Sequence, residues 1–223
     1  MSKVNYVLKS EKTIFGHPAG LFVLFFTELW ERFSYYGMRA LFTIFLVAEA
    51  TSQNPGFGWS NEDALWLYGW YTMMVYIVCI PGGWIADNFL GQKKTVMFGG
   101  LLLCLGHGIL AFNNEISFYI GCIFIILGVG GLKPNISSMV GGLYSKEDKR
   151  RDLGFYIFYM GINLGAFFAP LLCGWVGETY NWHFGFGIAA IGMIIGQFTY
   201  YFGQPYLKNV GNMKESTNEQ RKK

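Results

Sequence analysis

Hydrophobic residues fall into six long runs along this 223-residue chain, separated by short polar or Gly/Pro-rich stretches. A helix that crosses a bilayer needs about 20 mainly apolar residues, and each run approaches or exceeds that length. The pattern therefore predicts an all-α membrane protein built as a six-transmembrane-helix bundle. The predicted spans are 20–48, 63–86, 94–112, 116–142, 153–176 and 184–203.

The bundle, residues 20–203, lies between two polar ends, 1–19 and 204–223. The first ten residues lack the apolar core and the cleavage site of a signal peptide, so we expect the first span to act as its own insertion signal. From residue 208 onward the chain is polar, and we expect it to be disordered.

The composition agrees with a membrane environment. Only 14% of the residues are charged, whereas soluble domains carry about 25%. Thirty glycines suit close packing between membrane helices. The four cysteines lie far apart in apolar segments, so we expect no metal site. The chain contains neither a His-Glu-x-x-His nor a Gly-x-Ser-x-Gly motif, and we expect no catalytic residues and no enzymatic activity.

Basic residues orient the bundle. All but three of the seventeen Lys and Arg residues lie in the two ends or in the loops 88–94 and 145–152. The charged residues of the opposite loops are all acidic. Because loops rich in Lys and Arg stay on the cytoplasmic side, both termini are predicted to be cytoplasmic.

The first span contains charged side chains that are costly in a bilayer. An isolated charge at mid-membrane costs roughly 2.5–3.5 kcal/mol on insertion scales, and such residues usually mark a substrate or proton pathway. At 100° per residue several polar residues fall on one stripe, which we expect to face into the bundle while the apolar side faces outward. The stripe comprises Glu28, Arg32, Tyr35 and Arg39, flanked by Glu31 and Tyr36.

This stripe suggests coupling between a proton and an anion. Arg32 can pair with Glu28 or Glu31 while these are ionised, and protonation of a carboxylate would free the guanidinium for another carboxylate. The alternative is a buried ion cluster with a purely structural role.

Lys133 is a further intramembrane cation. Pro134 follows it directly and is expected to break or kink span four, a recurrent device at membrane binding sites. The alternative is a lysine that extends toward the cytoplasmic interface.

Three spaced motifs point to a known family. They are Glu28-x-x-Glu-Arg-Phe-x-Tyr-Tyr-Gly37, Gly82-Gly-Trp-Ile-Ala-Asp-Asn-Phe-Leu-Gly91 with Lys93 and Lys94, and Phe155-Tyr-Ile-Phe-Tyr-Met-Gly-Ile-Asn-Leu-Gly-Ala-Phe167. Over essentially its whole length the chain resembles the proton-dependent oligopeptide transporters, a branch of the major facilitator superfamily.

The resemblance implies roles for individual residues. Glu28, Glu31 and Arg32 would couple proton movement to transport. Arg39 and Lys133 would attract the peptide carboxylate. The other implied peptide contacts are Asn163, Tyr35, Tyr36 and Tyr76. Asp87 would be a gating residue, although it could equally cap its loop or pair with Lys93 or Lys94.

The resemblance also implies a missing partner, because transporters of this family have two six-helix halves. The chain resembles the N-terminal half, with its 3+3 repeat, and is not expected to transport alone. We expect di- and tripeptides as substrates, the lipid bilayer and a C-terminal half as partners, no nucleic acid, and no cofactor besides the proton as coupling ion. The expected location is the plasma membrane, or the inner membrane in a bacterium. Two alternatives are a non-transporting scaffold fragment and a transporter of nitrate or another small anion.

Overall fold

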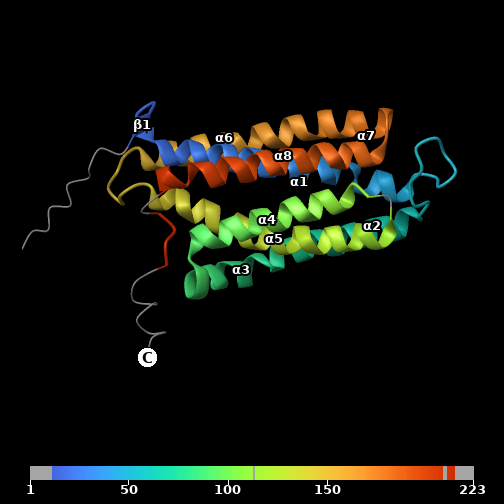
Figure 1. Cartoon of the computed structure of the whole chain (residues 1–223), viewed down its shortest axis with the longest axis horizontal. Helices are drawn as coiled ribbons and strands as arrows, with labels where there is room; N and C mark the ends of the chain where they lie inside the picture. Colours follow the sequence, from blue (N-terminus) through green and yellow to red (C-terminus); the bar gives the residue numbers. More distant parts are fainter. Residues whose placement is uncertain (1–11, 113, 208–209, 214–223) are drawn as a thin grey trace, which may run out of the picture.

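The computed structural model describes residues 12–112, 114–207 and 210–213. Its long helices run side by side along the longest axis of the molecule, and β1 lies at the same end as the last described residues (Figure 1). A short antiparallel hairpin of β1 (Thr13–Ile14) and β2 (His17–Pro18) precedes the bundle. Residues 1–11, which make up most of the predicted N-terminal segment, lie outside the described part.

All six predicted spans are found, and most of their ends agree within a few residues. Spans one, three, four and six are α1 (Ala19–Val47), α4 (Gln92–Leu110), α5 (Glu115–Gly142) and α8 (Trp182–Gly203). Span two consists of α2 (Asn61–Ile77), α3 (Cys79–Ile85) and the π-helical η1 (Ala86–Leu90). Span five consists of α6 (Arg151–Ala169), the π-helical η2 (Pro170–Gly174) and α7 (Trp175–Thr179).

Five of these spans are long and apolar enough to cross a membrane on length and composition alone. The sixth, α1, has ample length with 29 residues. It differs because it contains four charged residues, Glu28, Glu31, Arg32 and Arg39. The six-helix membrane bundle thus includes one span whose charges must be covered by its neighbours.

The first helix of each three-helix group, spans 1–3 and spans 4–6, packs mainly against the other group. Span one packs chiefly against spans five and six, through α6 and α8. Span four packs chiefly against spans two and three, through α3 and α4. Spans two and five also share a π-helical segment near one end. These correspondences are what a 3+3 repeat predicts, with the first helix of each repeat packed into the other.

Glycines bring α4 and α5 into close contact. A Cβ atom built on Gly128 would lie 2.8 Å from the Gly99 carbonyl oxygen, and one on Gly99 would lie 2.8 Å from that of Gly128. Side chains at either position would therefore push the two helices apart. The expected use of glycine in helix packing is confirmed at this interface.

Pro134 does not break span four, and that part of the prediction is wrong. The helix α5 continues through it to Gly142. Proline has no N–H, so the carbonyl of Gly130 loses its usual partner one turn earlier. Gly82 of α3 lies directly against this carbonyl, because a Cβ on Gly82 would overlap it. The helix thus passes through the proline beside a tightly packed neighbour.

The start of the predicted disordered tail is also wrong. After α8 the chain forms a short 3₁₀ turn, η3 (Gln204–Leu207), and continues along the base of α4. The Lys93 backbone N–H donates to the Gly211 carbonyl at 2.8 Å, and Val210 is buried. Residues 210–213 therefore pack on the bundle, and residues 214–223 lie outside the described part.

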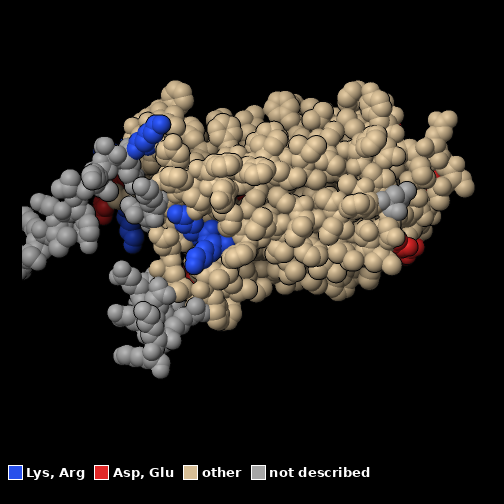
Figure 2. All heavy atoms as spheres, viewed as in Figure 1, with Lys and Arg blue, Asp and Glu red and all other residues tan. Residues whose placement is uncertain are grey.

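Charged side chains mark the two ends of the molecule differently. In Figure 2, Lys and Arg gather at the end that carries β1 and the last described residues, whereas an acidic side chain lies at the far end and uncharged residues cover the length between them. This distribution fits a bundle whose length crosses the bilayer.

Candidate substrate and proton-coupling site

The charged residues of span one form a buried cluster. Glu28, Glu31 and Arg32 are 2%, 0% and 3% exposed. The i,i+4 spacing places Glu28 one turn from Arg32, and the Arg32 Nε lies 3.0 Å from a Glu28 carboxylate oxygen. The same nitrogen also contacts a Glu31 oxygen. One guanidinium is therefore shared by two carboxylates.

The cluster has more acceptors than aligned donors. Within the described part of the chain, both Glu31 oxygens, one Glu28 oxygen and two Arg32 nitrogens make no aligned hydrogen bond. With both acids ionised the cluster carries one net negative charge, and one bound proton makes it neutral. Buried ions that lack hydrogen bonds are costly, so this arrangement favours proton uptake or an approaching cation. Lys133 of α5 acts electrostatically on both carboxylates.

A column of alternating cations and rings continues along α1. The Arg32 guanidinium lies 5.3 Å from the Tyr35 ring centroid, and the Arg39 guanidinium lies 5.6 Å from the same centroid. The predicted stripe is thus assembled by direct contacts. Tyr36 extends it sideways, with its ring 5.8 Å from Arg39.

The predicted outward apolar side of α1 is confirmed only at Phe26 and Ile44, which are exposed. Eighteen of the 29 residues of α1 are buried. Gly161 and Gly165 of α6 and Gly192 of α8 allow neighbouring backbones to approach, and Gly192 lies against the Phe33 ring. Neighbouring helices thus cover the charged part of α1 at Glu28, Glu31 and Arg32, which keeps these charges away from lipid.

Tyr68 of α2 contacts Arg39 of the candidate site, and the sequence analysis did not identify it. Its hydroxyl accepts a hydrogen bond from the Arg39 Nε at 2.7 Å, and a second contact joins it to Nη2. Its ring also lies 5.2 Å from the guanidinium. The only signal in the sequence was a further tyrosine in span two, whose partner depends on how α2 packs beside α1.

Lys133 and Tyr76 form a second cation–ring pair. The Lys133 Nζ lies 4.4 Å from the Tyr76 ring centroid, and Tyr76 is 56% exposed. The pair joins α5 to α2. Both Arg39 and Lys133 therefore rest on tyrosine faces, and neither forms an ion pair among the described residues.

The structure leaves two predicted site residues apart from this group. Asn163 of α6 is exposed, and its amide donates to the Tyr159 carbonyl of the same helix at 2.9 Å. Asp87 lies exposed in η1 at the basic end of the bundle. Within the described ranges it makes no ion pair with Lys93 or Lys94, so the alternative that it pairs with either lysine finds no support.

This fold and its buried charges define a multi-pass membrane protein of the major-facilitator type. The sequence profile of the POT family matches residues 93–223, and the chain belongs to this family. The family predicted from the three motifs is therefore confirmed.

Relatives support the assignment along most of the chain. The chain is 51% identical to a di-/tripeptide transporter of Lactococcus lactis subsp. cremoris over 88% of its own length and 40% of the relative's. It is 50% identical to the uncharacterized transporter YclF of Bacillus subtilis, over 92% and 42%. The crystal structure of a peptide transporter POT in complex with sulfate superposes with a TM-score of 0.87 at 44% identity, covering 95% of this chain and 44% of that one.

The chain thus spans about two fifths of the length of the curated relatives it matches. The family and the compared structures are transporters rather than enzymes.

Proposed function

We propose that this chain is the N-terminal six-helix half of a proton-coupled symporter that imports di- and tripeptides by alternating access, and that it does not transport alone. The observation that carries the proposal is the sharing of one buried guanidinium, Arg32, by Glu28 and Glu31. The relative named as a di-/tripeptide transporter supports the choice of substrate.

Proton coupling follows from the charge of the cluster. When one carboxylate takes up a proton, it becomes neutral and its attraction to Arg32 weakens. The guanidinium then becomes available to a carboxylate of the substrate. When the proton leaves, the ion pair reforms and the substrate loses this attraction. The proton is thus the coupling ion, and the proposed mechanism uses no other cofactor.

Peptide recognition would use the two cation–ring pairs. Arg39 and Lys133 supply positive charge for the C-terminal carboxylate of the peptide. Tyr35, Tyr36 and Tyr76 offer broad apolar surfaces with hydroxyls, which suit side chains of many kinds. Tyr68 orients Arg39 through its hydroxyl.

Two further residues have roles that rest on the family motifs. The side chain of Asn163 is exposed on α6. It would form a hydrogen bond with the peptide backbone once a second half closes the site. Asp87 would act in gating at the end of span two. Its exposure supports a partner outside the six helices described here.

The proposed location is the plasma membrane, or the inner membrane in a bacterium, with both chain ends in the cytoplasm. The gathering of Lys and Arg at the end that holds β1 supports this orientation (Figure 2). Cysteines introduced at Lys146, in the loop between α5 and α6, and at Glu62, in the first turn of α2 at the opposite end, would test it. A membrane-impermeant thiol reagent applied from outside the cell should label only the cysteine at position 62.

Uptake and binding experiments test the function. A transporter that contains this chain as its first six helices should concentrate a labelled dipeptide in proteoliposomes under an inward proton gradient, and the purified chain alone should not. Failure of the complete transporter to take up dipeptide would refute the proposal. If the chain associates with a membrane partner but no dipeptide is taken up with or without the gradient, the scaffold alternative is favoured instead.

A small-anion substrate is the second candidate, favoured by one observation. Arg39 and Lys133 form no ion pair among the described residues, so they would suit nitrate as well as a carboxylate. Competition separates the two candidates. Excess nitrate should leave dipeptide uptake unchanged if peptides are the substrate.

A further inference from the structure

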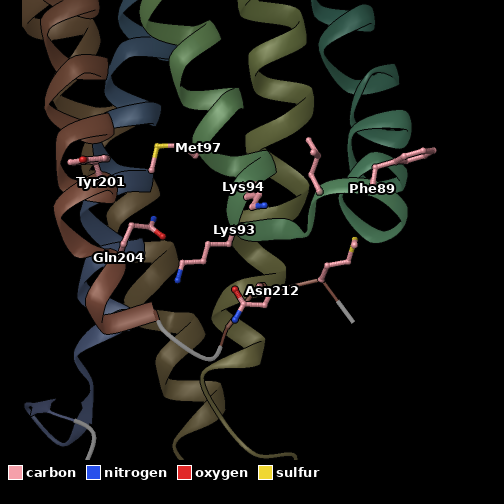
Figure 3. A pocket seen from close by; sticks show the side chains of 10 residues that line it. Phe89, Lys93, Lys94, Met97, Tyr201, Gln204 and Asn212 are labelled. Carbon is pink, nitrogen blue, oxygen red and sulfur yellow. The ribbon is translucent and has the colours of Figure 1, made fainter. Parts of the chain in front are cut away.

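A cavity of about 530 Å³ opens at the basic end of the bundle, and none of the proposed peptide contacts lines it. It lies between the start of α4, the end of α8 and the segment 210–213. The side chains that matter for its chemistry are Lys93, Lys94, Met97, Tyr201, Gln204 and Asn212. Figure 3 shows Lys93 extending into the space between Gln204 and Asn212.

Two ammonium groups in this cavity have no anionic partner among the described residues. The Lys93 Nζ donates to the Leu207 carbonyl at 3.1 Å, which fixes its side chain near the wall. Lys94 is exposed, and within residues 12–112, 114–207 and 210–213 neither lysine forms an ion pair. The nearby carboxylate of Asp87 lines a smaller adjoining cavity of about 200 Å³. The larger cavity therefore presents net positive charge.

An apolar surface leads out of the cavity along α4. Counting from Lys94 at helical spacing gives Phe98, Leu101 and Leu105, which are 53%, 46% and 55% exposed. These residues lie on one face of α4. Their exposure places an apolar track above the lysine.

A matching track runs along α8. From Tyr201 in the cavity wall, the same spacing gives Phe198, Ile194 and Ile191, which are 56%, 41% and 58% exposed. Because α4 and α8 pack against each other, the two tracks leave the cavity side by side and point toward the middle of the bilayer. A ligand that fits both parts has an anionic head and long apolar chains.

We propose that this cavity binds the phosphate of an anionic phospholipid, with phosphatidylglycerol as the representative, and that its acyl chains lie on the exposed faces of α4 and α8. Lys93 and Lys94 neutralise the phosphate. The hydroxyl of Tyr201 lies in the same wall to receive the polar head, beside Gln204, whose amide nitrogen donates to the Tyr200 carbonyl at 3.1 Å. Basic pockets between membrane helices are suited to such headgroups.

Native mass spectrometry of the purified chain tests the proposal, using phosphatidylglycerol and phosphatidylcholine as probes. Each lysine near an anionic headgroup contributes about 1 kcal/mol, or about a fivefold change in affinity. The double variant Lys93→Gln/Lys94→Gln should therefore bind phosphatidylglycerol about 25-fold more weakly. Phosphatidylcholine, which has no net charge, should bind both proteins alike.

The matched control is Lys146→Gln/Lys149→Gln, which removes the same charge from exposed positions between α5 and α6. This control should keep its affinity for phosphatidylglycerol. Equal losses in the two double variants would overturn the proposal, because they would indicate attraction to surface charge in general. Equal binding of the two lipids by the unaltered chain would overturn it as well.

Two further arms keep the test decisive. If the double variant fails to fold, Lys94→Gln alone should still weaken binding about fivefold, because this side chain is exposed and forms no ion pair with a described residue. Glycerol 3-phosphate should compete poorly with phosphatidylglycerol, since it lacks acyl chains. Competition at similar concentrations would refute a lipid and identify a soluble phosphate as the ligand.

Discussion

Replacing Glu31 by Gln tests the proposed coupling most directly. The variant removes one of the two carboxylates that share Arg32 and keeps the shape of the side chain. The cluster of Glu28 and Arg32 is then neutral without a bound proton. We expect peptide to bind and exchange across the membrane while the pH gradient no longer drives its accumulation.

The structure indicates that the variant should fold. Arg32 keeps its ion pair with Glu28 at 3.0 Å. At an effective dielectric constant of about 20, such a pair attracts by roughly 5–6 kcal/mol, before the cost of burying the two ions is subtracted. Removing Arg32 instead would leave two buried acids unpaired, and breaking a buried pair in this way costs about 3–5 kcal/mol.

The expected size of the coupling effect follows from the gradient. One pH unit corresponds to about 1.4 kcal/mol per proton, which supports about tenfold accumulation if one proton moves with each peptide. In proteoliposomes without a membrane potential, the unaltered transporter should approach this ratio. The Glu31→Gln variant should equilibrate the peptide at equal concentrations inside and outside.

The assay compares gradient-driven uptake with counterflow of a labelled dipeptide, in a transporter that contains this chain. Glu49→Gln is the matched control, because it makes the same chemical change at an exposed position beyond the end of α1. Undiminished gradient-driven accumulation by Glu31→Gln would refute the reasoning. Loss of both uptake and counterflow would show that the residue serves binding or folding instead.

Other changes probe recognition, packing and pH dependence. Lys133→Ala should weaken binding of dipeptides by about ten- to 100-fold, the equivalent of a charged hydrogen bond of about 1.5–3 kcal/mol, and spare their C-terminal amides in a competition assay. Gly128→Ala should lower thermal stability by about 1–3 kcal/mol because the new Cβ would meet the Gly99 carbonyl, whereas Gly83→Ala, with open space around it, should not. Hydrogen bonds from Arg150 lower the pKa of Asp148 to about 2. The contribution of Asp148 to the stability of the fold is therefore complete above its ordinary pKa of 3.8 and is lost as the pH falls toward 2. Asp148→Asn should therefore leave the pH profile of uptake between about pH 5 and 8 unchanged.

The sequence predicted the elements well because each has a strong local signal. Length and apolarity predicted the spans, and the contrast between basic and acidic loops distinguished the two ends of the bundle. The stripe from Glu28 to Arg39 was also predictable, since helical spacing alone places these residues on one side of α1.

The remaining features depend on packing between distant segments. The contact of Tyr68 with Arg39 requires the position of α2 beside α1, which no local pattern encodes. The neighbour of α5 at the turn before Pro134 is Gly82, which packs against the Gly130 carbonyl from a distant part of the chain. The order of residues 210–213 depends on the backbone of Lys93. In each case the deciding partner is more than 25 residues away in the chain.

The exchange of helices between the two repeats has a consequence for how the protein is made. The charges of α1 emerge from the ribosome first, but the helices that cover them come last. Leu29 packs against Gly165 and Phe33 packs against Gly192. These glycines are synthesised 136 and 159 residues later. At about 5–20 residues per second, synthesis of that length takes roughly 7–30 s. During this interval Glu28, Glu31 and Arg32 are without their final neighbours, so biogenesis requires that the insertion machinery, water or a transient ion pair shelter α1 until the last span arrives.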